Sequence, residues 1–135
     1  MKKKILYITT FYPTAHRPYH GIFFRDHAQA MGEYEDVAVL FVSVPSLRQS
    51  GKLADRVTIK KENGVTEISV TAPVLTHRSR NAIDRAYKRG ARKGIKALRQ
   101  QWQGNPDIAL AQTSLPAGKI ARYLYQEYSL CYGII

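Results

Sequence analysis

The chain has 135 residues, enough for one globular domain, and its hydrophobic content of 44% excludes an intrinsically disordered chain. Lysine and arginine outnumber aspartate and glutamate by 21 to 10, and the net charge of +11 favours an anionic partner such as nucleic acid, a lipid surface or a phosphorylated ligand. The single cysteine, Cys131, excludes an internal disulfide, fits a cytoplasmic location and is expected to be a buried structural thiol.

The first quarter of the chain predicts a strand, a loop and a helix. Residues Ile5–Thr9 form a short apolar run, as in a strand that is buried on both faces. Residues 11–20 contain two prolines and predict an irregular loop. Apolar residues then recur at helical spacing from Gly21 to Met31, so a helix is expected directly after the glycine.

The middle of the chain predicts three strands. Val37–Val44 is almost entirely apolar or β-branched and predicts a second buried strand, whereas the polar stretch Pro45–Arg56 predicts a loop. Two shorter strands, at Val57–Ile59 and Val65–Val70, flank Asn63-Gly64, a dipeptide that favours a tight turn. We therefore expect a hairpin, placed at one edge of the sheet.

The longest helical pattern covers Asn81–Trp102, where apolar residues recur every three or four positions and predict a stripe that faces the core. Gly90 and Gly94 either weaken this helix or allow it to pack closely. Six basic residues occupy the complementary face: Arg85, Lys88, Arg89, Arg92, Lys96 and Arg99. This face is open to three interpretations: a solvated surface, a patch for anionic lipid head groups, or a nucleic-acid surface. The absence of a nucleic-acid-binding motif argues against the last.

The final third of the chain predicts a strand at Asp107–Ala111, a helix capped by Thr113 or Ser114, and one more strand from Leu130. This alternation indicates an α/β, Rossmann-like fold, with a mostly parallel sheet and helices on both faces. The chain stops inside its last apolar run, so we expect it to be the N-terminal domain of a longer protein.

Ligands of an open parallel sheet bind beyond the carboxyl ends of its strands. Two segments are expected there and close together, Phe11–Gly21 and Gln112–Ser114. Gly21 either exposes free backbone N–H groups to a ligand or only eases the turn into the helix. The G-x-G-x-x-G and P-loop patterns are absent, and the histidines of the first loop lack metal-ligand spacing, so neither a dinucleotide nor a metal is expected. No residue is assigned a catalytic role.

Four stretches of the chain resemble the N-terminal domain of GT-B-fold glycosyltransferases of the retaining, family-four type. They read KILYITTFYP, HGIFFRDHAQAM, ENGVTEISV and PDIALAQTSLPAGKIARYLYQEYSLCYGII, in the family's order. The resemblance implies that residues 1–135 are the acceptor-side domain of a hexosyltransferase, and that a C-terminal domain absent from this chain mainly holds the nucleotide sugar. Such enzymes need no metal or other cofactor, and this chain alone is expected to be inactive.

The resemblance also implies substrate-binding roles for both loops. The first loop of the family approaches the donor diphosphate and the acceptor, which assigns Tyr12, His20 and Gly21 to substrate binding. Gly21 matches one glycine of a frequent Gly-Gly pair. Beyond the strand that ends at Ala111, the family often carries His-x-His, and here Gln112, followed by Thr113, offers amide hydrogen bonds in place of an imidazole.

The family's acceptors are glycans or lipid-linked sugars, and many relatives work at the inner membrane face. The basic face of the long helix is therefore expected to dock on anionic lipid. Two alternatives stay open: a stand-alone α/β module that binds a nucleotide or phosphorylated ligand, and a basic nucleic-acid-binding domain.

Overall fold

A computed structural model describes residues 1–135 and places six strands in one sheet, in the order β3-β4-β2-β1-β5-β6. The strands are β1 (Lys4–Thr9), β2 (Asp36–Ser43), β3 (Arg56–Glu62), β4 (Val65–Thr71), β5 (Ile108–Ala111) and β6 (Tyr132–Ile134). The helices are α1 (Ile22–Gly32), α2 (Leu47–Ser50), α3 (Arg80–Trp102) and α4 (Ala117–Tyr128). All neighbouring strands pair in parallel except β3, which runs antiparallel to β4. The expected α/β, mostly parallel fold is confirmed.

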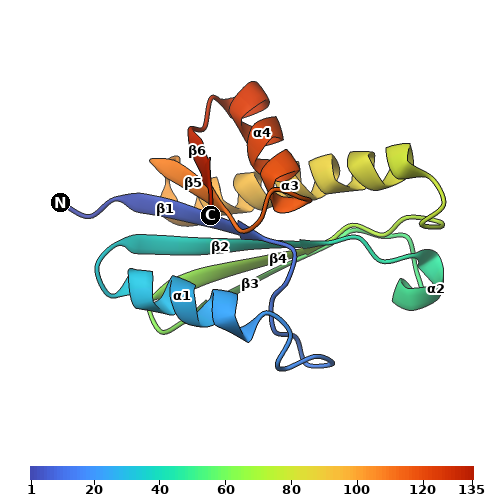
Figure 1. Cartoon of the computed structure of the whole chain (residues 1–135), viewed down its shortest axis with the longest axis horizontal. Coiled ribbons are helices and arrows are strands. Elements are labelled where there is room, and N and C mark those ends of the chain that lie inside the picture. The colour runs from blue at the N-terminus through green and yellow to red at the C-terminus, as the bar shows by residue number, and fades with distance from the viewer.

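The helices lie on both faces of the sheet, as expected: α1 covers one face, and α3 and α4 cover the other (Figure 1). The chain first moves from β1 to β2 on one side and later returns to place β5 on the other side of β1. Strand order therefore reverses between β1 and β5, which is the point where open α/β sheets bind their ligands. None of the helices combines the length and the apolarity needed to span a bilayer.

The two faces of β1 and β2 bury different clusters because side chains alternate along a strand. Leu6, Ile8 and Leu40 join the main core beneath α3 and α4, while Tyr7 and Val39 join a smaller core beneath α1. On α3, the two glycines sit directly over β2, where a Cβ on Gly94 would lie 2.2 Å from Leu40 Cδ1. Close packing, rather than weakening of the helix, therefore accounts for these glycines.

The hairpin prediction is confirmed, and β3 is one of the two edge strands of the sheet, with β6 at the other edge. The turn residues Asn63 and Gly64 both adopt positive φ angles, 52° and 79°, as a tight turn of this kind requires. Six of the seven residues of β3 are exposed, because β3 borders only β4 and no helix covers it.

Three local expectations are wrong. The stretch expected as a loop contains α2, whose capping box pairs Ser46 with Gln49, a signal present in the sequence. Neither Thr113 nor Ser114 caps α4: the N-cap position belongs to Pro116, and the Thr113 hydroxyl donates to the Leu115 carbonyl instead. Cys131 is exposed rather than buried, because it lies in the short connection between α4 and β6.

Candidate functional site

The segment after β5 begins beside the end of β1, from which the first loop leaves the sheet. The backbone N–H of Gln112, just beyond β5, donates to the Ile8 carbonyl of β1 across 2.9 Å. The strand register pairs Ile8 with Ala111, so Thr9 and Thr10 leave the sheet next to Gln112. We use the name edge site for three residues at this switch point: Thr10, Gln112 and Thr113.

The edge site contains buried polar atoms without hydrogen-bond partners. Gln112 is 6% exposed, and its Nε2 atom has no acceptor. The Thr10 hydroxyl is likewise buried and unpartnered. Leaving such a group unsatisfied costs about 1–3 kcal/mol, so native proteins retain few of them. Both residues directly follow neighbouring strands, β1 and β5, at the carboxyl edge where the fold class binds ligands.

Thr113 adds backbone strain to the same place. Its φ angle is 78°, in the left-handed region that a β-branched residue rarely adopts. The conformation is held by the Thr113 hydroxyl, which donates to the Leu115 carbonyl at 3.0 Å. Strain of this kind costs about 1–3 kcal/mol and clusters at ligand sites, where the surrounding structure maintains it.

Gly21 is required by the packing of the first loop. Its φ angle is 69°, and a Cβ built there would lie 2.4 Å from the Phe11 carbonyl oxygen. The loop thus folds back over the glycine, a requirement that holds whether or not a ligand binds. No side chain caps α1, but the N–H groups of Ile22 and Phe24 donate to the backbone carbonyls of Tyr19 and Gly21, which leaves the N–H of Phe23 in the first turn.

The two aromatic residues predicted to bind substrate lie in different surroundings. His20 is partly buried, with its ring centroid 5.1 Å from that of Phe11 in the same loop. Tyr12 is only 3% exposed and turns beneath the sheet, where its ring centroid lies 6.0 Å from that of Phe41 on β2. The structure therefore places Tyr12 on the α1 face of the sheet rather than among the edge-site residues.

Beside Tyr12 is a polar groove that the sequence analysis did not predict. It has a volume of about 530 Å³ and is lined by loop residues 12–16 and by side chains of β2, β3 and β4. Glu67 of β4 lies in its wall, 8% exposed. The sequence of residues 66–71 does indicate such a polar face, because polar side chains there alternate with Ile68 and Val70. Such alternation indicates a strand with one face not covered by apolar groups.

Tyr12 and Glu67 approach each other inside the groove, and Arg25 of α1 lies nearby. Even so, no hydrogen bond of standard geometry reaches the Tyr12 hydroxyl, the Glu67 Oε1 atom or the Arg25 Nε atom, and all three atoms are buried. Burial raises the pKa of the Tyr12 hydroxyl and also that of the Glu67 carboxyl.

No group of three histidine, cysteine, aspartate or glutamate side chains is arranged to hold a metal ion. His27, which the sequence places near the first loop, instead docks α1 on the sheet. Its Nδ1 atom lies 2.6 Å from the Tyr7 hydroxyl, and burial raises the pKa of Tyr7 to about 12.

The six basic residues predicted on α3 do not form one free face. Arg89 and its neighbour Lys93 both lie 2.8 Å from Asp55, in the segment before β3. Burial opposes the charge on Asp55, but the hydrogen bonds from Arg89 and Lys93 outweigh this effect and lower its pKa. Arg89 therefore anchors α3 to the rest of the fold and is not available to an anionic surface.

The remaining basic residues of α3 border α4. Arg92 donates to the Tyr123 hydroxyl, at 3.0 Å from Nη2, and Lys88 lies 5.8 Å from the centre of the same ring. Arg99 stacks over Tyr128 at 4.7 Å. Only Arg85 and Lys96 have neither an ion pair nor a side-chain hydrogen bond nor an aromatic partner. Four of the six predicted residues are thus held by other side chains of the fold.

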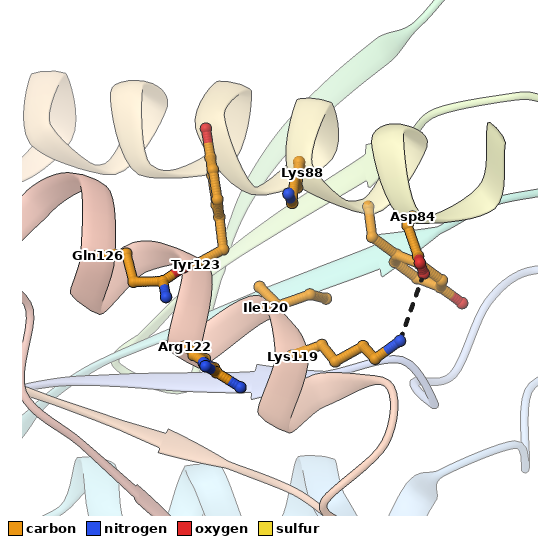
Figure 2. A pocket seen from close by; sticks show the side chains of 8 residues that line it. Asp84, Lys88, Lys119, Ile120, Arg122, Tyr123 and Gln126 are labelled. Carbon is orange, nitrogen blue, oxygen red and sulfur yellow. Dashed lines mark ion pairs between the residues drawn. The ribbon is translucent and has the colours of Figure 1, made fainter. Parts of the chain in front are cut away.

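Figure 2 shows a cavity of about 220 Å³ between α3 and α4. Lys88 enters it from α3, and Lys119 and Arg122 enter from α4, so three of its eight lining residues are cationic. Asp84 offsets part of this charge through an ion pair with Lys119 at 3.6 Å. The surface between the two helices is thus cationic and lies on the opposite side of the sheet from α1 and the polar groove.

The predicted substrate-binding residues therefore do not all lie together. Gln112 and Thr113 lie at the end of β5 beside β1, while Tyr12 lines the polar groove with Glu67. His20 and Gly21 lie in the first loop, each against Phe11. No protein-family model matches the chain, and a search of curated proteins finds no match either.

Proposed function

We propose that the chain is the acceptor-side domain of a retaining GT-B-fold glycosyltransferase, which moves a hexose from a nucleotide sugar to a glycan or lipid-linked acceptor once a second domain supplies the donor site. The observation that carries this proposal is the edge site. It gathers two unpartnered buried polar atoms and a strained threonine at the point where strand order reverses.

The sequence resemblance supports the same assignment from a different direction. Of the four stretches that carry it, the first supplies β1 and its loop, the second supplies Gly21 and α1, and the last supplies β5, Gln112 and Thr113. The first and last of these stretches are more than ninety residues apart in the chain, and they meet where β1 pairs with β5.

Each edge-site residue takes a role that its geometry allows. Gln112 would donate its unpartnered Nε2 hydrogens to a sugar hydroxyl, which replaces a buried unsatisfied donor with a hydrogen bond. At the start of α1, the Phe23 N–H would be the group available to a phosphate oxygen of the donor, since helix N-termini favour anions. The reacting sugar itself would be held by the second domain, so this chain alone is expected to be inactive.

The test is transfer by the longer parent protein that this proposal requires. Given UDP-, GDP- and ADP-linked hexoses with membrane or glycan extracts, the parent should release nucleoside diphosphate, and the 135-residue chain should not. Gln112→Ala in the parent should lower transfer about tenfold, the equivalent of about 1.4 kcal/mol from a lost hydrogen bond. Gln101→Ala, at an exposed position of α3, should leave it unchanged.

Two results would contradict the proposal. One is a parent frame that stops at the end of this chain, which would favour a stand-alone α/β binding module. The other is a parent that releases no diphosphate from any of these donors.

We also propose that the α3–α4 surface docks on anionic lipid, which would hold the enzyme at the membrane that carries a lipid-linked acceptor. The support is the cationic surface of Figure 2, together with Arg85 and Lys96, which have no partner in the fold. Each basic residue near an anionic membrane contributes about 1 kcal/mol, and salt weakens the effect.

A triple variant that lacks three exposed charges of α3 should bind vesicles of phosphatidylglycerol and phosphatidylcholine about 100-fold more weakly. Its substitutions are Arg85→Ala, Lys88→Ala and Lys96→Ala. The matched control removes three exposed charges elsewhere, by Lys2→Ala, Lys3→Ala and Lys61→Ala. Co-sedimentation across a salt series measures both. Equal losses in the two variants, or equal binding to vesicles of phosphatidylcholine alone, would contradict a specific docking surface.

A further inference from the structure

We propose that the polar groove beneath β2, β3 and β4 binds an uncharged sugar unit, with Glu67 and Tyr12 as its hydrogen-bonding groups. This inference rests on the proposed function, because it assigns the groove to a part of the acceptor that lies away from the reacting end. It adds a second contact region to the edge site, on the α1 face of the sheet.

The groove exists because the helix layer on that face is incomplete. The strand register aligns three rows of side chains on the same face: Lys60 with Glu67, Thr58 with Ser69 and Phe41, and Arg56 with Thr71 and Ser43. The loop after β1, rather than a helix, covers these rows on one side. Figure 1 shows this loop passing below the sheet before α1 begins. Ser43 and Thr71 are the last residues of their strands, so the groove extends to the carboxyl edge.

Two features of the groove indicate a ligand rather than a solvated surface. Its volume of about 530 Å³ falls within the range of roughly 300–1,000 Å³ that is usual for small-molecule sites. Glu67 is also more than nine-tenths buried. Its carboxyl group faces the equally buried Tyr12 hydroxyl, yet neither its Oε1 atom nor that hydroxyl has a hydrogen bond of standard geometry. A carboxylate and a phenol in this state would both gain hydrogen bonds from an incoming hydroxyl group.

The charges around the groove favour a neutral ligand. Arg25 of α1, with Arg56 and Lys60 of β3, disfavours an incoming cation. Glu67 disfavours an incoming anion, and Glu62 offsets the charge of Lys60 through an ion pair at 2.8 Å. The hydroxyl-bearing side chains in the wall are Thr14, Ser43, Thr58, Ser69 and Thr71. These groups complement an alcohol-rich ligand, and the ring of Phe41 offers an apolar surface to one face of a sugar.

The test measures sugar binding to the 135-residue chain by two-dimensional NMR. The probes are the methyl glycosides of glucose, galactose, mannose, rhamnose and N-acetylglucosamine, and of glucuronic acid as the anionic comparison. Each is added at about 10 mM, where a site of millimolar affinity fills. At least one neutral glycoside should shift the amide signals of Ser43, Ser69 and Thr71, and the glucuronide should not.

Glu67→Met then separates binding from folding. It should weaken the binding of that glycoside at least tenfold, yet raise the melting temperature by about 4 °C, because an unpartnered buried carboxylate is removed. Lys61→Met, on the neighbouring strand with its side chain on the other face, should leave binding unchanged.

Three outcomes would overturn the inference: no shift with any neutral glycoside, shifts confined to α3 and α4, or undiminished binding by Glu67→Met. If the parent protein still transfers a hexose in any of these cases, the proposed function stands and only the groove is wrong. If the groove binds sugar and the parent transfers nothing, the groove stands without the transferase.

Discussion

Gly21→Ala should lower the free energy of unfolding by about 3 kcal/mol, because the new methyl group meets the backbone of the same loop. Its Cβ would lie 2.4 Å from the Phe11 carbonyl oxygen and 2.8 Å from the Tyr12 nitrogen, and neither atom is the end of a flexible side chain. The left-handed φ of 69° adds about 1–2 kcal/mol, and overpacking adds about 1–3 kcal/mol. Urea unfolding followed by circular dichroism gives the difference.

Gly64→Ala is the matched control for this substitution. Gly64 has a similar φ of 79°, but a Cβ there would have no atom within 4 Å. Gly64→Ala should therefore lower the free energy of unfolding only through its left-handed backbone, by about 1–2 kcal/mol. The difference between the two variants isolates the clash, and equal losses would show that the first loop yields to the methyl group. Because this loop carries both Thr10 and Tyr12, Gly21→Ala should also perturb the edge site and the polar groove.

The double variant Gly90→Ala and Gly94→Ala should lower the free energy of unfolding by about 3 kcal/mol, although alanine is the better helix former. The helix gains about 1 kcal/mol for each such replacement. Against this, the new Cβ atoms would lie 2.6 Å from Val42 Cγ1 and 2.2 Å from Leu40 Cδ1, on a buried strand that cannot withdraw. Overpacking at two adjoining sites outweighs the gain in propensity.

A double-mutant cycle identifies the contact responsible. Leu40→Ala alone should cost about 2–5 kcal/mol, because it leaves a cavity under α3. In that background, Gly94→Ala should become neutral or stabilising, since its methyl group enters the space that the leucine leaves. Thermal or urea unfolding of the four proteins measures the coupling. Additive losses would mean that α3 moves away from the sheet instead.

The order of strands and helices could be predicted because periodicity reports which faces are buried. The continuous apolar runs of β1 and β2 indicate strands covered on both faces, and the spacing of apolar residues in α3 indicates one face against a core. Asn63-Gly64 likewise predicts the hairpin, since its positive φ angles are a local property of those two residues. The meeting of Gln112 with the first loop follows from the parallel topology.

The remaining features depend on contacts between distant segments, which a local pattern does not report. The strain at Thr113 and the close approach of Phe11 to Gly21 exist only in the folded chain. Asp55, in a loop more than thirty residues away, forms ion pairs with Arg89 and Lys93. Fewer basic residues of α3 are therefore unpaired than the sequence predicts. Glu67 falls within the strand predicted for the hairpin, and its alternation with Ile68 indicates a face that apolar groups do not cover, but not that the first loop closes over it.

The exposed position of β3 also affects how copies of this chain behave towards one another. An edge strand presents unpaired backbone groups that could pair with another chain, and Val57 and Ile59 are each about two-fifths exposed on it. Arg56, Lys60 and Lys61 place like charges along the same strand, so two such edges repel each other. Salt screens that repulsion within a Debye length of about 8 Å at physiological strength. The basic composition thus protects this strand from aggregation, independently of any ligand that the charge attracts.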